Sequence, residues 1–245
     1  MSQSEFFVGY LPAPRATRRA ALVFAVLLCV AFAGLAAVVG RTPFDIDSSQ
    51  YGEDIAATGV FVARPYPLIV AAADAAHPHG RTLLLGGEGK HGAQDFGRSL
   101  DGRLARLEGV LVARGDIDMA LVGGADQLRP VDGAAVAPQA APLGRWRIAG
   151  EICDGKCAAG GMRPGTGLAH KACANLCIST GLPPVFVASK PIEGRSSLLL
   201  ASRDGGPAPE SIADMTAVPV TLEGDVVRLG DLLVFRVDWD RARRE

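Results

Sequence analysis

The stretch "LARLEGVLVARGDIDMALV" (residues 104–122) has a second copy in the chain, "PVTLEGDVVRLGDLLVFRV" (219–237). One offset of 115 residues aligns the two copies without a gap. The same offset aligns "RTLLLGGEGKHGAQ" (81–94) with "SSLLLASRDGGPAP" (196–209). Two separate stretches that share one register indicate a duplication inside the chain, so the sequence predicts two structural units of the same kind.

Each copy consists of short runs rich in Val, Leu and Ile that are separated by Gly-Asp pairs. Runs of this length at close spacing are typical of small antiparallel sheets closed into barrels. The sequence therefore predicts a mainly β fold with two tandem OB-like β-barrel units, over residues 55–123 and 147–239. Two segments, 94–107 and 169–179, have a pattern that favours a helix. The stretch 124–146, dense in Ala, Pro and Gly, is predicted to link the units.

The second copy is longer than the first. Gly59 and Gly109 of the first copy are 50 residues apart, whereas Gly150 and Gly224 of the second are 74 apart. The second copy therefore contains about 24 additional residues. They fall in a cysteine-rich stretch, which predicts an insertion on a scaffold that the first copy forms without it.

Residues 20–40 contain no charged side chain and follow Arg15, Arg18 and Arg19. A helix of this length spans the roughly 30 Å of a hydrocarbon core. By the positive-inside rule, the head (1–19) stays in the cytoplasm and the remainder of the chain is exported. The sequence thus predicts a single-pass protein of the bacterial inner membrane with its bulk in the periplasm. A cleaved signal peptide is the alternative, although its apolar region is normally shorter.

The insertion holds four of the five cysteines, in the loop 153–177. A helix over its second half places His170, Cys173 and Cys177 on one face, because residues three and four apart are neighbours on a helix surface. Together with Cys157 they form a Cys₃His set, which suits zinc or another metal that prefers soft ligands. The spacing is not that of the usual C-x2-C knuckle.

Two other interpretations of the loop stay open. Cys153, Cys157, Cys173 and Cys177 can form two disulfides, as exported loops often do. Alternatively, Cys153 and Cys157 are a reactive thiol pair. Cys29 lies in the apolar segment and is expected to behave as a small apolar residue.

The loop resembles a group of uncharacterised bacterial membrane-anchored proteins. The similarity rests on "GEICDGKC" (150–157), on "HKACANLCISTGLPPVFV" (170–187) and on the head "FFVGYLP" (6–12). More distantly, it is similar to small secreted bacterial proteins of unknown function with a D-S-x-C…H…C-x3-C pattern. The matching positions are Asp154, Lys156, Cys157, His170, Cys173, Cys177, Gly181, Pro183 and Pro184.

This sequence departs from the pattern at two positions: Gly155 replaces the usual Ser, and Cys153 replaces an apolar residue. The resemblance therefore implies a core of three cysteines and one histidine. Three cysteines cannot all pair with one another, so the resemblance favours a metal or a functional thiol over two disulfides.

Other candidate sites are weaker. His77 and His79 form an H-x-H pair that could bind copper or zinc, but an ordinary solvated turn explains it better. "GGEGKHG" (86–92) lacks the phosphate-loop pattern and is interpreted as a hairpin turn. Asp116 and Asp231 recur after glycines, and turn chemistry explains them better than paired carboxylates do.

The sequence therefore favours a non-enzymatic role. We expect an anchored periplasmic binding or accessory protein that contacts a protein partner in the membrane or periplasm and serves a membrane redox or metal-handling system. The alternatives are a thiol-disulfide or electron-transfer component and a structural interaction module with two disulfides. With 25 basic and 26 acidic residues, the chain has no excess of positive charge that would attract nucleic acid.

Overall fold

The computed structural model describes residues 15–41, 50–113, 115–162 and 165–244. The chain divides into two compact units, Met1–Ile46 and Asp47–Glu245. Most of the predicted head lies outside the described residues.

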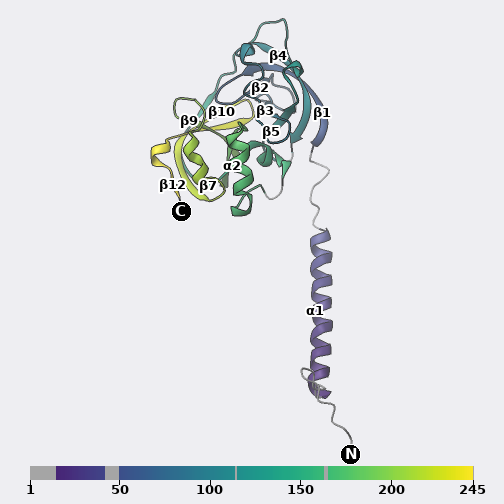
Figure 1. Cartoon of the computed structure of the whole chain (residues 1–245). Coiled ribbons are helices and arrows are strands. Elements are labelled where there is room, and N and C mark those ends of the chain that lie inside the picture. The colour runs from purple at the N-terminus through teal and green to yellow at the C-terminus, as the bar shows by residue number, and fades with distance from the viewer. Residues whose placement is uncertain (1–14, 42–49, 114, 163–164, 245) are drawn as a thin grey trace, which may run out of the picture. The chain divides into compact units, whose positions relative to one another are not determined.

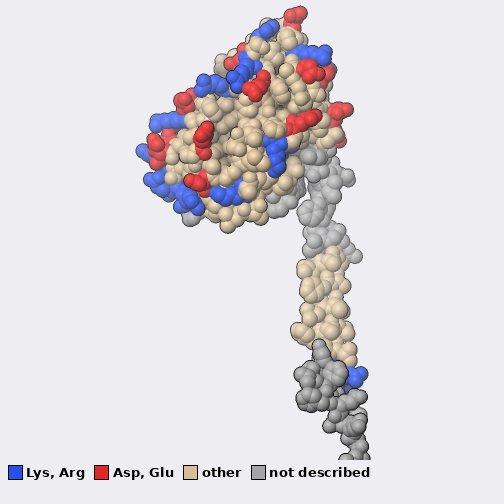
Figure 2. Space-filling view, in the orientation of Figure 1, with Lys and Arg blue, Asp and Glu red and all other residues tan. Residues whose placement is uncertain are grey.

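The first unit contains the helix α1 (Arg15–Arg41), which includes the predicted span 20–40. Its segment Thr17–Val38 is long and apolar enough to cross a membrane, a property that a signal sequence shares. In Figure 2 the blue side chains of this helix lie near its N-terminal end, and residues 20–40 contain no charged side chain. The apolar helix is thus confirmed, while the orientation of its two ends stays a prediction.

The second unit begins with a five-stranded barrel, β1 to β5. Its strands are β1 (Gln50–Val62), β2 (Leu68–Ala71), β3 (Thr82–Gly87), β4 (Leu104–Ala113) and β5 (Asp118–Val122). They pair in the order β1-β2-β3-β5-β4, and pairing of β4 with β1 closes the barrel (Figure 1). Only β3 and β5 pair in parallel; the other contacts are antiparallel.

A second barrel follows with the same strand order. Its strands are β7 (Ala141–Asp154), β8 (Pro184–Ile192), β9 (Arg195–Ser202), β10 (Pro219–Leu229) and β11 (Leu232–Val237). They pair in the order β7-β8-β9-β11-β10, and β10 closes the barrel on β7. The prediction of two tandem OB-like barrels is confirmed.

The residue registers of the two barrels confirm the predicted repeat. Leu84 pairs with Met119 in the first barrel, and Leu199 pairs with Val234 in the second, each partner shifted by 115 residues. The antiparallel pairs between the fourth and fifth strands obey the same offset. Because pairing register places every side chain on one face or the other, the two sequences bury equivalent positions.

The registers also place the insertion between the first two strands of the second barrel. Val62 pairs with Leu68, six positions later, whereas Cys153 pairs with Val185, 32 positions later. The second barrel is therefore 26 residues longer at this point. Its next connection is two residues shorter, which gives the predicted net difference of 24. Cys153 stands where the first barrel has Val62.

A short extra strand follows each barrel. The strand β6 (Leu128–Pro130) pairs with the start of β4, and β12 (Arg243–Arg244) pairs with the start of β10. The predicted linker, 124–146, thus contains β6 and the beginning of β7. The linking chain between these two strands is 131–140.

One of the two predicted helices is wrong and the other is confirmed. The segment 94–107 contains only a 3-10 turn, Arg98–Leu100. Its last residues belong to the strand β4. Pairing with β1 overrides the helical pattern there. In 169–179, a 3-10 turn leads into α2 (Lys171–Ser179).

The described residues form three apolar cores, one inside each barrel and one between them. Equivalent residues fill the two interiors, for example Phe61 and Ile152, Leu83 and Leu198, and Ala120 and Phe235. Equivalent residues from the outer faces of both barrels also meet in the third core. Its pairs are Leu68 and Val185, Leu84 and Leu199, Val112 and Val227, Ile117 and Leu232, and Met119 and Val234. The barrels therefore pack against each other through the same face.

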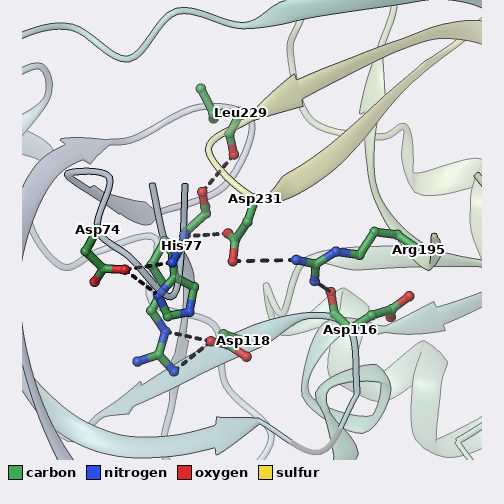
Figure 3. A network of polar contacts seen from close by, with 9 residues as sticks. Asp74, His77, Asp116, Asp118, Arg195, Leu229 and Asp231 are labelled. Atoms are coloured by element: carbon green, nitrogen blue, oxygen red, sulfur yellow. Dashed lines mark hydrogen bonds and ion pairs between the residues drawn. The ribbon is translucent and has the colours of Figure 1, made fainter. Parts of the chain in front are cut away.

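Polar contacts between the barrels are reciprocal as well, and Figure 3 shows those of Asp231 and Arg195. Asp231 Oδ1 accepts a hydrogen bond from the backbone N–H of Thr82 at 2.7 Å. At the equivalent place, Asp116 Oδ2 accepts one from the backbone N–H of Ser197 at 3.0 Å. Arg195 lies between the two acids, 3.7 Å from the Asp231 carboxylate and 2.6 Å from the Asp116 carbonyl oxygen. Such self-complementary contacts are a property of two-fold symmetric dimers, here within one chain.

The contacts between the barrels add a second role to the turn chemistry that the sequence predicts for Asp116 and Asp231. Each does follow a glycine in the turn between the fourth and fifth strands. Each turn, however, directs its carboxylate to the third strand of the other barrel. The Gly-Asp pair thus occurs in both copies for two reasons: it forms the local turn, and its carboxylate binds the other barrel.

Candidate metal centre

The insertion occupies the loop between the first and second strands of the second barrel. It leaves β7 at Asp154 and returns at Pro184. This connection is one of the loops with which OB folds bind their ligands. The first barrel spans the same gap with the short segment 63–67, so the insertion is an addition to a complete barrel.

Three short elements make up the insertion. A π-type turn, Cys157–Gly161, follows β7, and Gly160 in it has a φ of 110°, which a residue without a β-carbon adopts at low cost. The chain then returns through a 3-10 turn, Leu168–His170, to α2. The Lys171 ammonium fixes the start of α2, because it donates hydrogen bonds to the carbonyls of Ala213, Asp214 and Thr216.

These elements bring Cys157, His170 and Cys173 together. One ligand atom from each lies within 4.8 Å of the others. Cys157 and His170 are buried, and Cys173 is partly exposed. Bonds of about 2.3 Å from sulfur and 2.0–2.1 Å from nitrogen to one ion require separations of this order. The three residues are therefore close enough to hold one metal ion.

Asp154 orients the histidine. Its Oδ2 lies 3.1 Å from His170 Nε2, and its Oδ1 accepts a hydrogen bond from the Cys157 backbone N–H at 3.0 Å. The carboxylate is fully buried. A carboxylate that accepts the Nε2 proton fixes the tautomer and leaves Nδ1 with the lone pair for a metal. Carboxylate, imidazole and metal in this order are a common arrangement in protein metal sites.

A second group with suitable distances consists of Cys153, Asp154 and His170. Both oxygens of Asp154 already have partners, as described above. The Cys153 thiol donates a hydrogen bond to the Gly165 carbonyl at 2.6 Å. Because both oxygens of Asp154 and the Cys153 thiol already have hydrogen-bond partners, the contacts favour Cys157, His170 and Cys173 as the ligand set.

Cys177, the fourth predicted ligand, is not part of the three-membered group. It lies beside Cys173, with a hydrogen bond between the two thiols. Its side chain is buried in the core between the barrels, and burial raises its pKa to about 12.

The four cysteines of the alternative disulfide interpretation, Cys153, Cys157, Cys173 and Cys177, are all free thiols. Burial, followed by the charge of Asp154, also raises the pKa of Cys157. Without a metal, its buried thiol is therefore in the neutral form at neutral pH.

Lys90 is a residue of this site that the sequence analysis missed. Its ammonium nitrogen lies 2.8 Å from the Cys173 sulfur, and this hydrogen bond raises the pKa of Lys90. Lys90 belongs to the loop after β3 of the first barrel, 83 residues away in sequence. The same loop accepts a hydrogen bond from Lys156 at the Gly89 carbonyl and donates one from the Gly92 N–H to Thr180. The first barrel thus covers part of the insertion of the second.

The histidines of the H-x-H pair do not converge on a metal-ligating group within the described residues. Asp74 Oδ1 accepts hydrogen bonds from the backbone N–H groups of Ala76 and His77, which is an Asx turn. His77 Nδ1 lies 3.3 Å from the same oxygen, and His79 is exposed. The loop 86–92 likewise forms a tight turn, with the Gly87 N–H bonded to the His91 carbonyl.

Comparisons with known protein families, with curated proteins and with solved structures find no match for this chain.

Replacing Asp154 with asparagine should weaken metal binding by about 10- to 100-fold, the usual cost of losing the partner of a ligating histidine. The amide can still accept from the Cys157 N–H, but an amide NH₂ cannot accept the Nε2 proton of His170. Competition against a chromophoric chelator measures the affinity. Glu151→Gln is the matched control, because Glu151 holds the Gly167 N–H of the same loop at 2.7 Å without touching a ligand. Equal affinity in Asp154→Asn and Glu151→Gln would contradict the assigned role.

Proposed function

We propose that the chain is a membrane-anchored accessory protein that binds a soft metal ion through Cys157, His170 and Cys173. The observation that carries the proposal is the convergence of these three ligand atoms within 4.8 Å. They come from three elements, the π-type turn, the 3-10 turn and α2. Convergence of donors from separate elements supports a binding site better than a spacing pattern does.

The donor set supports a particular class of ion. Two thiolates and one imidazole suit Zn²⁺ and Cu⁺, whereas Mg²⁺ and Ca²⁺ prefer oxygen ligands. The site also has the surroundings of a metal centre, because Asp154 fixes the histidine and Lys90 donates to the Cys173 sulfur.

The cellular setting is part of the same proposal. The apolar helix α1 would anchor the protein in the bacterial inner membrane, and the two barrels would lie in the periplasm. The role that fits is a binding or accessory subunit for a membrane-associated redox or metal-handling system. The first barrel forms without such an insertion, so a barrel of this kind does not need a metal in order to fold. A metal held on the added loop therefore supports a site that serves a partner.

Mass spectrometry of the full chain, purified from a membrane fraction in detergent, tests the proposal. The intact mass is taken under native and denaturing conditions, together with elemental analysis of the same sample. We expect a native mass that exceeds the denatured mass by one metal ion, and thiols that titrate fully after unfolding.

Two other results decide against the proposal. A denatured mass about 4 Da below the reduced value, with no native excess, would show two disulfides among the loop cysteines. A native mass without excess and with all thiols titratable would leave the loop without a metal and would favour the thiol-based alternative.

A further inference from the structure

A small cavity reaches one side of the candidate metal centre. Its volume is about 230 Å³, and its walls include Cys157, Cys153 and Met162. The remaining lining residues are small or uncharged: Gly115, Ala158, Gly160, Gly165, Thr166, Val187 and Ser197. Among the residues that the structure describes, none that lines the cavity carries a charge. The cavity therefore lies beside Cys157, one of the three ligands, and its size suits a small molecule.

The Cys173 ligand already has a polar contact. The Lys90 ammonium lies 2.8 Å from the Cys173 sulfur, so a positive charge lies against this ligand. An ammonium group has no lone pair and cannot itself bind the metal. The cavity beside Cys157 is therefore the side from which we expect a further ligand to approach.

Cys177 is placed to pack rather than to bind. Its side chain is only 2% exposed and belongs to the apolar core between the barrels, together with Leu182 and Val185. It stands outside the group whose ligand atoms all lie within 4.8 Å. For Cys177 to become a ligand, its sulfur would have to leave a core that both barrels form.

We propose that the metal has three protein ligands and that its fourth position is open to a small molecule with a soft donor atom, such as a thiol. This inference rests on the proposed function, because it presupposes a metal at Cys157, His170 and Cys173. Sites with three protein ligands leave a position for water or substrate, whereas structural zinc sites close with a fourth. The centre would thus be an exchange site for a small ligand, rather than a structural clamp.

The cavity agrees with this class of ligand. Its volume corresponds to only a few small groups, since one water takes about 30 Å³ in the liquid. Met162, a residue of its wall, is 44% exposed, so this part of the wall is in contact with solvent.

The test uses Co²⁺ as a spectroscopic probe in the full chain, with β-mercaptoethanol as the small ligand. The ligand-field absorption of Co²⁺ reports the number and type of its ligands. We expect the bands of the loaded protein to shift as thiol is added, with saturation and with the cobalt content unchanged by elemental analysis. Cys177→Ala should bind cobalt and respond in the same way as the unchanged chain.

A pair of variants at Met162 tests the route of entry. Met162→Trp narrows the cavity without changing a ligand and should weaken the thiol response at least about tenfold while cobalt stays bound. Met162→Leu keeps the volume and is the matched control, with a response close to that of the unchanged chain.

The outcomes separate the two proposals. If the unchanged chain binds no cobalt, the proposed function itself fails. If cobalt binds but its spectrum does not respond to thiol, the fourth position is closed and the further inference is overturned. Loss of cobalt from a folded Cys177→Ala variant would overturn it as well, since Cys177 would then be the fourth ligand. If Cys177→Ala does not fold, the thiol response of cobalt in the unchanged chain still shows whether the fourth position is open.

Discussion

Replacing Cys157 with serine is expected to reduce bound metal from one ion per chain to none that survives desalting. Cys157 is one of the three converging ligands, and the serine hydroxyl is a hard, neutral donor that a soft ion binds poorly. With this change the group retains only one thiolate and one imidazole. Elemental analysis of the purified full chain measures the loss directly.

Two matched cysteine variants sharpen this result. Cys153→Ser distinguishes the two groups with suitable distances, because Cys153 belongs only to the one with Asp154 and His170. We expect it to retain the metal. Cys29→Ser, in the apolar helix, controls for the loss of a thiol as such. Full loss of metal in Cys153→Ser together with retention in Cys157→Ser would move the site to the other group.

Much of the fold could be predicted because the chain repeats itself. A single offset of 115 residues aligned Leu84 with Leu199, and the strands containing them pair in the same register in both barrels. The position of the insertion followed from the spacing of glycines that the strands require. At Gly109 and Gly224, an added β-carbon would collide with a carbonyl oxygen of the neighbouring strand. Both positions are therefore glycine, and such glycines can be recognised in the sequence.

The segment 94–107 shows where local pattern misleads. Its apolar spacing favours a helix, yet its last residues continue into a strand that pairs with β1 over its full length. Non-local pairing of this kind is invisible to a window of neighbouring residues.

The site was predictable only where its residues lie close together in the sequence. The helical spacing of His170 and Cys173, with Cys157 upstream, was enough to suggest that they converge. Lys90 could not be found in this way, because its contact with Cys173 depends on how the first barrel packs on the second. Asp154 was noticed only as part of a resemblance, and its pairing with His170 became visible once the loop was folded.

Replacing Asp231 with alanine is expected to destabilise the two-barrel unit by about 2–3 kcal/mol. The carboxylate accepts a hydrogen bond from the backbone N–H of Thr82, a residue that is 2% exposed. A hydrogen bond to a charged group contributes about 1.5–3 kcal/mol, and a buried N–H left without a partner has a desolvation cost of similar size. For a unit of this length, the loss corresponds to a decrease in Tm of about 4–12 °C.

The reciprocal contact predicts a similar cost for Asp116→Ala, because Asp116 accepts from the backbone N–H of Ser197 in the other barrel. Asp74→Ala is the matched control. Asp74 also accepts two backbone hydrogen bonds, but both come from its own exposed turn. Its loss should change stability by less than about 1 kcal/mol, since exposed groups exchange their partner for water.

Thermal and urea unfolding of the three variants measure these differences. If the two acids hold the barrels together through one interface, each cross-barrel variant will unfold earlier than Asp74→Ala, and the pair will shift Tm by comparable amounts. Equal stability of Asp231→Ala and Asp74→Ala would show that the carboxylates act only as local turn residues. The apolar pairs between the barrels, such as Leu84 and Leu199, would then hold the interface alone.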